Sequence, residues 1–294
     1  MLLPEIQQHQ ISLHLRREDL THPMLSGNKF RKLKYNVQEA KKGNCNTLLT
    51  FGGAYSNHIP ATAYAASANG MSSIGIIRGE ELADRWKDNP TLVSAAKMGM
   101  EFDFVSREEY RLRDNKDYQA DLLSGHQAAY LIPEGGTNTL GVKGCEEILT
   151  AEDGCYDIIC CAAGTGGTLA GLSNSAREHQ NILGFPALKG DFLKDDIGKY
   201  TTEQNWTLIT AYHFGGYGRV TKELVAFINS FRERTKIPLD PVYTGKMMYG
   251  IIDMVKQGKF KNGTKILAIH TGGLQGIEGM NGILRKKNLP LLSI

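Results

Sequence analysis

The chain has 294 residues, and its 34 Lys and Arg against 31 Asp and Glu leave a formal net charge of only +3. This balance does not indicate a nucleic-acid partner. Its 41% apolar and 22% charged residues exclude wholesale disorder, coiled coil and collagen-like repeats. The composition is unusual in its 33 glycines beside only 9 prolines. Such a surplus is typical of backbone that approaches a ligand or another segment closely.

The sequence shows no pattern of a targeting or membrane segment. Residues 1–10 are polar and carry no apolar signal core, and no uncharged apolar run reaches the roughly 20 residues that span a bilayer. The five Cys residues form no CxxC motif and no zinc-type spacing with His. We therefore expect a cytoplasmic protein with reduced thiols, no metal, and neither a membrane nor a nucleic-acid partner.

In the first half of the chain, apolar periodicity alternates between strand and helix patterns. A short strand is expected over residues 11–15, and a helix is expected to begin near Lys29 and to end at Gly43. The polar stretch 107–121 is interpreted as a solvated surface segment. Further strands are predicted over 47–51, 73–77, 101–105 and 130–133, and further helices over 61–68 and 90–98.

The second half repeats this alternation. Strands are predicted over 156–163, 208–212 and 265–270, and helices over 169–177, 220–232 and 249–256. Strands that alternate with helices imply parallel sheets and the α/β class. No solenoid-type repeat is present.

Three loops rich in Gly or other small residues each follow a predicted strand, where parallel sheets bind ligands. Gly164–Thr168 joins a strand to a helix and suits a phosphate, because glycine lets backbone N–H groups approach an anion; the alternative is a tight turn without a ligand. Ser56-Asn57-His58 precedes an Ala-rich helix and suits either a carboxylate site or simple helix capping. The third loop, His270–Gly273, stands at another predicted strand end; the alternative is a plain turn without a ligand.

Lys29 is the most informative single residue. It opens a predicted helix, where a positive charge opposes the helix dipole. A lysine placed there against this bias is typical of an amine that meets a phosphate or forms a Schiff base with an aldehyde. The alternative is an exposed surface lysine.

Six motifs in register carry a resemblance that extends from Arg16 to Gly273. Together they resemble the 1-aminocyclopropane-1-carboxylate (ACC) deaminase and D-cysteine desulfhydrase family, whose members are pyridoxal-phosphate enzymes of the tryptophan-synthase β-like fold (fold type II). The motifs are Asp19-Leu20, Ser26-Gly27-Asn28-Lys29-Phe30-Arg31-Lys32-Leu33, Ser56-Asn57-His58, Gly164-Thr165-Gly166-Gly167-Thr168-Leu169-Ala170-Gly171-Leu172, Pro241-Val242-Tyr243-Thr244-Gly245-Lys246 and His270-Thr271-Gly272-Gly273.

The resemblance implies a role for each matching position. Lys29 is expected to bind pyridoxal phosphate covalently, with Lys32 adding a positive charge near the phosphate. Asn57 is expected to hydrogen-bond the ring oxygen of the cofactor, and Ser56, with the backbone at Asn57 and His58, to hold the substrate carboxylate. Two phenols, Tyr243 and, with a less complete match, Tyr217, are expected in the active site; the alternative for both is a core or rim tyrosine. The phosphate loop consists of Gly164, Thr165, Gly166, Gly167 and Thr168.

Three positions separate the two activities of the resembled family. ACC deaminases resemble one another in having Gln, Glu and Leu where this chain has His58, Thr244 and Thr271. Thr244 and Thr271 are expected beside the cofactor. A neutral Thr in place of Glu near the pyridine nitrogen weakens the electron sink, which β-elimination of a thiolate tolerates better than opening of a cyclopropane. The resemblance therefore implies D-cysteine desulfhydrase activity.

Other functions stay open from the sequence. ACC deamination to 2-oxobutanoate needs the same lysine and cofactor, and so does elimination from another β-substituted amino acid. A non-catalytic phosphate- or nucleotide-binding module is the rival from another class; the third glycine of a dinucleotide fingerprint is replaced by Leu169.

The expected architecture is an α/β protein of two domains with twisted, mainly parallel sheets flanked by helices. The smaller domain is expected over residues 34–141, and the larger over 1–33 and 142–294, with the cofactor between them. The substrate is expected to be a small amino acid. The family is usually dimeric, so the resemblance also implies a homodimer.

Overall fold

The computed structural model describes residues 3–22, 25, 27–190 and 192–293. Ser26, which belongs to the lysine motif, lies outside the described residues. By its internal contacts the chain divides into two compact units. Unit 1 contains residues 1–21, 26–28 and 145–294, and unit 2 contains residues 22–25 and 29–144. The sequence-based boundaries at 34 and 141 stay a prediction for the folding domains.

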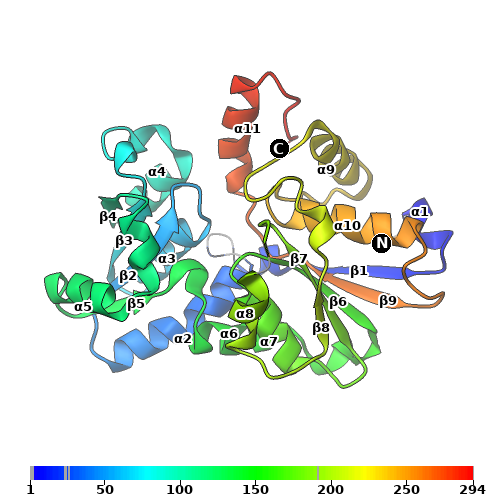
Figure 1. The fold of residues 1–294 in the computed structure, drawn as a ribbon, viewed down its shortest axis with the longest axis horizontal. Helices are drawn as coiled ribbons and strands as arrows, with labels where there is room; N and C mark the ends of the chain where they lie inside the picture. Colours follow the sequence, from blue (N-terminus) through cyan, green and yellow to red (C-terminus); the bar gives the residue numbers. More distant parts are fainter. Residues whose placement is uncertain (1–2, 23–24, 26, 191, 294) are drawn as a thin grey trace. The chain divides into compact units, whose positions relative to one another are not determined.

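Unit 2 is built on a sheet whose described strands are all parallel, in the order β4-β3-β2-β5 (Figure 1). The strands are β2 (Thr47–Gly53), β3 (Ser72–Arg78), β4 (Met100–Val105) and β5 (Ala129–Ile132). The helices that accompany them are α2 (Asn28–Lys42), α3 (His58–Ser67), α4 (Pro90–Lys97), α5 (Lys116–Gly125) and α6 (Thr139–Glu146), of which α2 and α6 cross the boundary between the units.

The two faces of this sheet are covered by different helices, because alternate strand residues point to opposite sides. Leu48 packs with apolar residues of α2 and α3, and Ile77 packs with residues of α3 and α4. On the other face, Phe51 and Ile76 pack with Tyr110 and with Tyr118 of α5. The polar segment 107–121, which was predicted to be solvated, therefore contains the start of α5 and the buried Tyr110, which is 2% exposed.

Unit 1 contains a second sheet whose described strands are again all parallel, in the order β1-β9-β6-β7-β8 (Figure 1). The strands are β1 (Ser12–Arg16), β6 (Ile158–Ala163), β7 (Asn181–Pro186), β8 (Trp206–Leu208) and β9 (Lys265–Ile269). Its helices are α1 (Pro4–Gln7), α7 (Gly167–Ser175), α8 (Phe192–Gly198), α9 (Lys222–Thr235), α10 (Thr244–Lys256) and α11 (Gly276–Lys286).

Parallel strands alternating with helices confirm the predicted α/β class. Among the strands of unit 1, one expectation is wrong and one strand was not expected. The strand predicted over 208–212 ends at Leu208, and Thr210–Tyr212 forms a 3-10 turn. Strand β7 was not predicted, because Gly184 interrupts its short apolar run; a Cβ there would lie 2.1 Å from Cδ1 of Leu169. Glycine at 184 therefore lets α7 pack directly on the sheet.

Within the described residues, no helix is both long and apolar enough to cross a membrane. The same residues contain no group of three or more His, Cys, Asp and Glu side chains arranged to hold a metal ion.

Candidate active site

The loops singled out in the sequence follow the carboxyl ends of parallel strands, as ligand sites do in such sheets. In unit 2, Ser56 follows β2 and the 3-10 turn Glu134–Gly136 follows β5. In unit 1, Gly164 follows β6 and His270 follows β9. Within each unit, these loops thus follow the carboxyl ends of that unit's own strands, as expected.

Lys29 and Lys32 meet in unit 2 at a single backbone carbonyl. The Nζ atom of Lys29 donates to the Gly135 oxygen at 2.9 Å, and Nζ of Lys32 donates to the same oxygen at 3.2 Å. Lys32 also donates to Oγ1 of Thr137 at 2.8 Å, although its side chain is only 2% exposed. Burial of an ammonium group is unfavourable unless hydrogen-bond acceptors satisfy it. Two amines therefore lie side by side on one carbonyl, as the predicted roles of Lys29 and Lys32 require, and those roles stay a prediction.

The turn that offers this carbonyl is anchored through Glu134. The Tyr110 hydroxyl donates to Oε1 of Glu134 at 2.8 Å, and Nε of Arg113 lies 2.8 Å from Oε2. Burial raises the pKa of Tyr110, and the Glu134 carboxylate raises it further. Tyr110 is thus a neutral donor at physiological pH, and it fixes the residue that precedes Gly135.

Ser56 and Asn57 lie at the start of α3. The Ser56 hydroxyl accepts from the backbone N–H of His58 at 3.3 Å. Asn57 occupies the N-cap position, but its side chain makes no capping hydrogen bond. Helix capping therefore does not account for the amide of Asn57, whereas Ser56 acts partly as a local cap. The role of either residue toward substrate or cofactor stays a prediction.

His58 is buried beneath this region, with its ring 0% exposed. The Thr50 hydroxyl donates to the Ile132 oxygen at 2.8 Å, so it accepts from Nε2–H of His58 at 2.9 Å. Nδ1 of His58 has no hydrogen-bond partner among the described residues. The imidazole is therefore a neutral group on the sheet side of the helix, and any part of His58 that meets a carboxylate is its backbone.

The burial of His58 makes a pH-dependent prediction. Desolvation holds the pKa of His58 well below 6.5, and the charges of Lys29 and Lys32 lower it further. Below pH 6.5 the unfolded chain binds a proton that the folded chain does not, so stability is lost as the pH falls. We expect the stability gap between the wild type and His58→Gln to shrink by up to about 1.4 kcal/mol per pH unit below about pH 6.5.

Denaturant unfolding at several pH values between about 5 and 7.5 measures this gap. The exposed His179 supplies the control, because His179→Gln leaves His58 in place and should keep the wild-type pH dependence. Parallel stability curves for the wild type and His58→Gln would contradict the expectation.

In unit 1, the predicted phosphate loop turns sharply from β6 into α7. A Cβ on Gly166 would lie 2.6 Å from Cγ1 of Ile197, so no larger residue fits there without a shift. Thr168 is 4% exposed in the first turn of α7, and its hydroxyl accepts from Nδ2 of Asn28 at 2.8 Å. Thr165 and Gly167 complete the turn into a nine-residue helix, whose N-terminus favours negative charge.

Both predicted phenols lie close to this loop within unit 1. A Cβ on Gly164 would be 3.1 Å from the hydroxyl oxygen of Tyr243, so the phenol packs against the loop backbone. The rings of Tyr217 and Tyr243 are 6.1 Å apart in an edge-to-face arrangement. Tyr243 is half-buried, whereas Tyr217 is 44% exposed. The structure therefore brings both phenols and the phosphate loop together.

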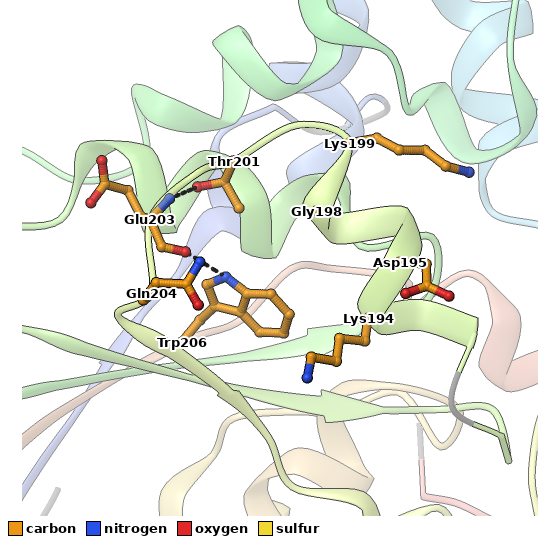
Figure 2. A pocket seen from close by; sticks show the side chains of 8 residues that line it. All are labelled: Lys194, Asp195, Gly198, Lys199, Thr201, Glu203, Gln204 and Trp206. Carbon is orange, nitrogen blue, oxygen red and sulfur yellow. Dashed lines mark hydrogen bonds between the residues drawn. The ribbon is translucent and has the colours of Figure 1, made fainter.

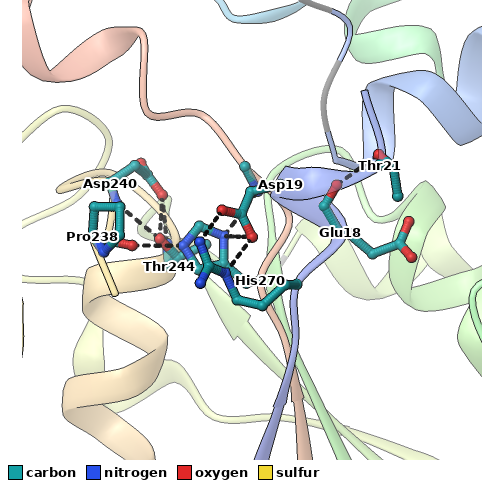
Figure 3. Close-up of polar contacts among 9 residues, drawn as sticks. Glu18, Asp19, Thr21, Pro238, Asp240, Thr244 and His270 are labelled. Atoms are coloured by element: carbon teal, nitrogen blue, oxygen red, sulfur yellow. Dashed lines mark hydrogen bonds and ion pairs between the residues drawn. The ribbon is translucent and has the colours of Figure 1, made fainter. Parts of the chain in front are cut away.

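Thr244 is held by a buried carboxylate that the sequence analysis did not single out (Figure 3). Asp240, which is 1% exposed, accepts from the backbone N–H groups of Val242, Tyr243 and Thr244 and from the Thr244 hydroxyl, at 2.7–3.0 Å. The hydroxyl proton of Thr244 is thus directed to Asp240. The signal available in the sequence was an acidic residue just before the Pro-Val-Tyr motif.

A second buried network holds the loop after β9 (Figure 3). Arg17 donates to both carboxylate oxygens of Asp19, at 2.7 and 2.6 Å, and Oδ1 of Asp19 lies 3.4 Å from Nδ1 of His270. Nε2 of His270 donates to the Pro238 oxygen at 2.7 Å. The sequence motifs contained Asp19 and His270, but only the fold shows that they are neighbours.

Gly27, two residues before the lysine, packs against the backbone of Thr271. Its φ is +69°, and a Cβ there would lie 2.0 Å from the Thr271 oxygen. The backbone N–H of Gly27 also donates to the Glu18 oxygen at 2.8 Å. Only glycine therefore satisfies both the conformation and the close approach at this position.

These residues fit pyridoxal phosphate. The cofactor requires an amine for its aldehyde and an anion cradle for its phosphate. Unit 2 offers Lys29 with Lys32 beside it, and unit 1 offers the glycine turn at the start of α7. The two phenols and Thr271 belong to the same unit as that turn.

A surface pocket of about 430 Å³ lies elsewhere in unit 1, between α8 and β8 (Figure 2). Most of the residues that line it are polar or charged, and none of them is predicted for the active site. The lining residues are Lys194, Asp195, Gly198, Lys199, Thr201, Glu203, Gln204 and Trp206.

Three features define an enzyme that works through an amine-bound cofactor. They are a lysine at the start of a helix, a glycine-rich turn suited to a phosphate, and two parallel sheets flanked by helices. The sequence pattern of the pyridoxal-phosphate dependent enzymes matches residues 2–272 of this chain. The chain belongs to this family, and pyridoxal phosphate is its cofactor.

Similar proteins carry both of the names expected from the motifs. A putative ACC deaminase of Pyrococcus horikoshii is 33% identical, over 93% of this chain and 88% of its own length. A bifunctional D-cysteine desulfhydrase and ACC deaminase of Arabidopsis thaliana is 34% identical, over 90% of this chain and 73% of its own length. A D-cysteine desulfhydrase of Klebsiella pneumoniae is 29% identical, over 92% and 90%. The expected family is confirmed.

Solved structures agree with the fold. The crystal structure of an ACC deaminase homologue superposes with a TM-score of 0.80 at 30% identity, covering 96% of this chain and 91% of its own. Serine racemase from Dictyostelium discoideum superposes with a TM-score of 0.64 at 15% identity, over 92% and 90%. The second likeness concerns the fold alone, which is the expected tryptophan-synthase β-like architecture.

Proposed function

We propose that this protein catalyses β-elimination from a small D-amino acid, with D-cysteine as the favoured substrate. D-cysteine and water would yield pyruvate, hydrogen sulfide and ammonia. The observation that carries the proposal is the convergence of Lys29 and Lys32 on the Gly135 carbonyl. That arrangement supports a role for Lys29 as the amine for the cofactor aldehyde, with a second positive charge beside it.

Pyridoxal phosphate supplies an electron sink for the negative charge that develops at the substrate α-carbon. In our assignment Lys32 and the turn Gly164–Thr168 bind its phosphate, and Asn57 hydrogen-bonds its ring oxygen. Ser56, with backbone N–H groups at the start of α3, holds the substrate carboxylate.

The remaining roles concern protons. Nζ of Lys29 would take the α-proton of the bound substrate. The phenols of Tyr243 and Tyr217 orient the β-substituent and stabilise the departing thiolate. Positioned acid and base groups of this kind contribute roughly 10²–10⁴-fold to rate.

The preference for D-cysteine rests on Thr244, Thr271 and His58. Thr244 is neutral, and its hydroxyl donates to Asp240 at 2.7 Å. A neutral group that already has this partner supports the weaker electron sink, which thiolate loss tolerates. The names of the Klebsiella and Arabidopsis relatives also support desulfhydration.

ACC deamination to 2-oxobutanoate and ammonia is the second candidate. The names of the Pyrococcus horikoshii relative and of the crystallised homologue favour it. Both reactions need the same lysine and cofactor, so cofactor binding does not separate them.

A substrate panel tests the proposal. The purified protein should show a visible absorbance band, and borohydride should fix the cofactor onto Lys29. D-cysteine should then give pyruvate and sulfide, while ACC gives little 2-oxobutanoate. Sulfide from L-cysteine alone, or turnover of ACC alone, would contradict the substrate assignment. A colourless protein that takes up no pyridoxal phosphate would contradict the site itself.

We also propose that the protein is a homodimer, as the resemblance implies. Light scattering coupled to size exclusion measures this directly. A mass near that of a single 32.4 kDa chain would contradict it.

A further inference from the structure

Lys246 is a buried lysine to which the proposed chemistry assigns no role. It lies in the first turn of α10 and is 2% exposed. Its Nζ atom donates to the His213 oxygen at 2.9 Å and to the Gly216 oxygen at 2.8 Å. Among the described residues no carboxylate forms an ion pair with this ammonium. The Lys246 ammonium therefore donates to backbone carbonyls of a single turn, residues 213–218.

That turn has an unusual backbone. Phe214 has a φ of +52°, and Gly215, Gly216 and Gly218 have φ values of +90°, +111° and +66°. A non-glycine residue at positive φ is disfavoured, and glycine retains much freedom in the unfolded chain. A run of such residues needs outside contacts to hold one conformation. The two bonds from Lys246 supply such contacts.

One of these bonds bears directly on Tyr217. The Gly216 carbonyl belongs to the peptide group that joins Gly216 to Tyr217, so its direction sets where the tyrosine side chain starts. Tyr217 is 44% exposed, and its ring meets the edge of Tyr243 at 6.1 Å. The direction of the Gly216–Tyr217 peptide group therefore helps to set where this ring lies.

A buried lysine at this position is unfavourable for the stability of the fold. Burial lowers the pKa of Lys246 to about 8, against an opposing effect of Asp240. Apolar residues of similar volume commonly stabilise a core better than a buried charge does. An ammonium retained at such a site indicates a use beyond packing.

We propose that Lys246 is a positioning residue, which holds the 213–218 turn so that the Tyr217 phenol faces the reacting groups. The catalytic part of this inference rests on the proposed function. Lys246 acts through Tyr217 and has no contact with substrate or cofactor in our assignment.

Hydrogen exchange tests the structural part without any cofactor or substrate. In cofactor-free Lys246→Met, we expect amide exchange over residues 214–219 to rise by tenfold or more relative to the wild type, with α9 and β9 unchanged. Lys256→Met is the matched control, because Lys256 lies exposed in the last turn of the same helix. Unchanged exchange over 214–219 would overturn the inference, whatever the enzyme turns over.

A double-mutant cycle tests the catalytic part. We expect Lys246→Met to lower kcat by about tenfold to a hundredfold while the visible cofactor band persists. In a Tyr217→Phe background the same substitution should lower kcat by less than about threefold, because the phenol is already absent. Equal losses in the two backgrounds would overturn the positioning role. If Lys246→Met does not fold, Lys246→Gln replaces it in both measurements, since its shorter amide cannot reach both carbonyls.

Failure of the proposed function and failure of the inference about Lys246 give different results. A wild type that turns over no amino acid sinks the proposed function, while the exchange measurement still decides whether Lys246 holds the turn.

Discussion

Replacing Lys29 by Ala should lower turnover by about a thousandfold or more and abolish the covalent cofactor band. In the proposed function, this substitution removes both the amine that binds the aldehyde and the group that takes the α-proton. The Ala side chain suits an α-helix, and Lys29 stands in its first turn. The free energy of unfolding should therefore change little, and the loss should be chemical.

Two comparisons make this prediction specific. Lys32→Met removes the neighbouring charge but keeps the Lys29 amine, so it should weaken cofactor binding while covalent attachment persists. Lys41→Ala is the control on the same helix, because Lys41 donates to Asn69 at the exposed surface and its loss should leave the protein like the wild type. Absorbance, borohydride reduction and turnover measure all three. Persistent wild-type turnover in Lys29→Ala would refute the assignment of the cofactor lysine.

Replacing Asp240 by Ala should destabilise unit 1 by about 3–5 kcal/mol and also lower activity. The carboxylate accepts from three backbone N–H groups and from the Thr244 hydroxyl, so truncation leaves several buried donors without an acceptor. Those donors orient Tyr243 and Thr244 at the start of α10. Burial raises the pKa of Asp240, and the bonds from Thr244 oppose that shift.

Denaturant unfolding measures the stability loss, and the kinetics of the folded fraction measure the loss of activity. Asp196→Ala is the control, since Asp196 pairs with Lys199 at the exposed surface and should change stability by less than about 1 kcal/mol. Stability losses of the same small size in both variants would show that the Asp240 network contributes little to holding α10.

Strongly periodic segments were predictable from the sequence. Helix α2 was expected from Lys29 to Gly43 and spans Asn28–Lys42, with Leu33 and Val37 in the core. Strands β2, β3 and β4 match their apolar runs to within two residues at each end. In these segments the local pattern and the tertiary packing require the same structure, so either one identifies it.

Other segments depend on packing that no local pattern reveals. Helix α11 contains Gly276, Gly279 and Gly282, which disfavour a helix in isolation. It forms because Ile277, Met280 and Leu284 fall on one face and bury into the core of unit 1. Helix α10 begins at Thr244 instead of the expected 249, because the Asp240 carboxylate satisfies the backbone before it.

The glycine surplus shows what the sequence by itself determined and what only the tertiary structure decided. Motif order alone identified the family and predicted roles for Lys29 and the turn Gly164–Thr168, because covalent chemistry and phosphate binding demand particular residue types at particular strand ends. Two other features could be recognised only from the tertiary structure. They are the close approach of Gly27 to Thr271 and the hydrogen bonds from Lys246 to the 213–218 turn. These are contacts between residues far apart in the chain, and their partners are set by how helices pack on sheets rather than by local sequence.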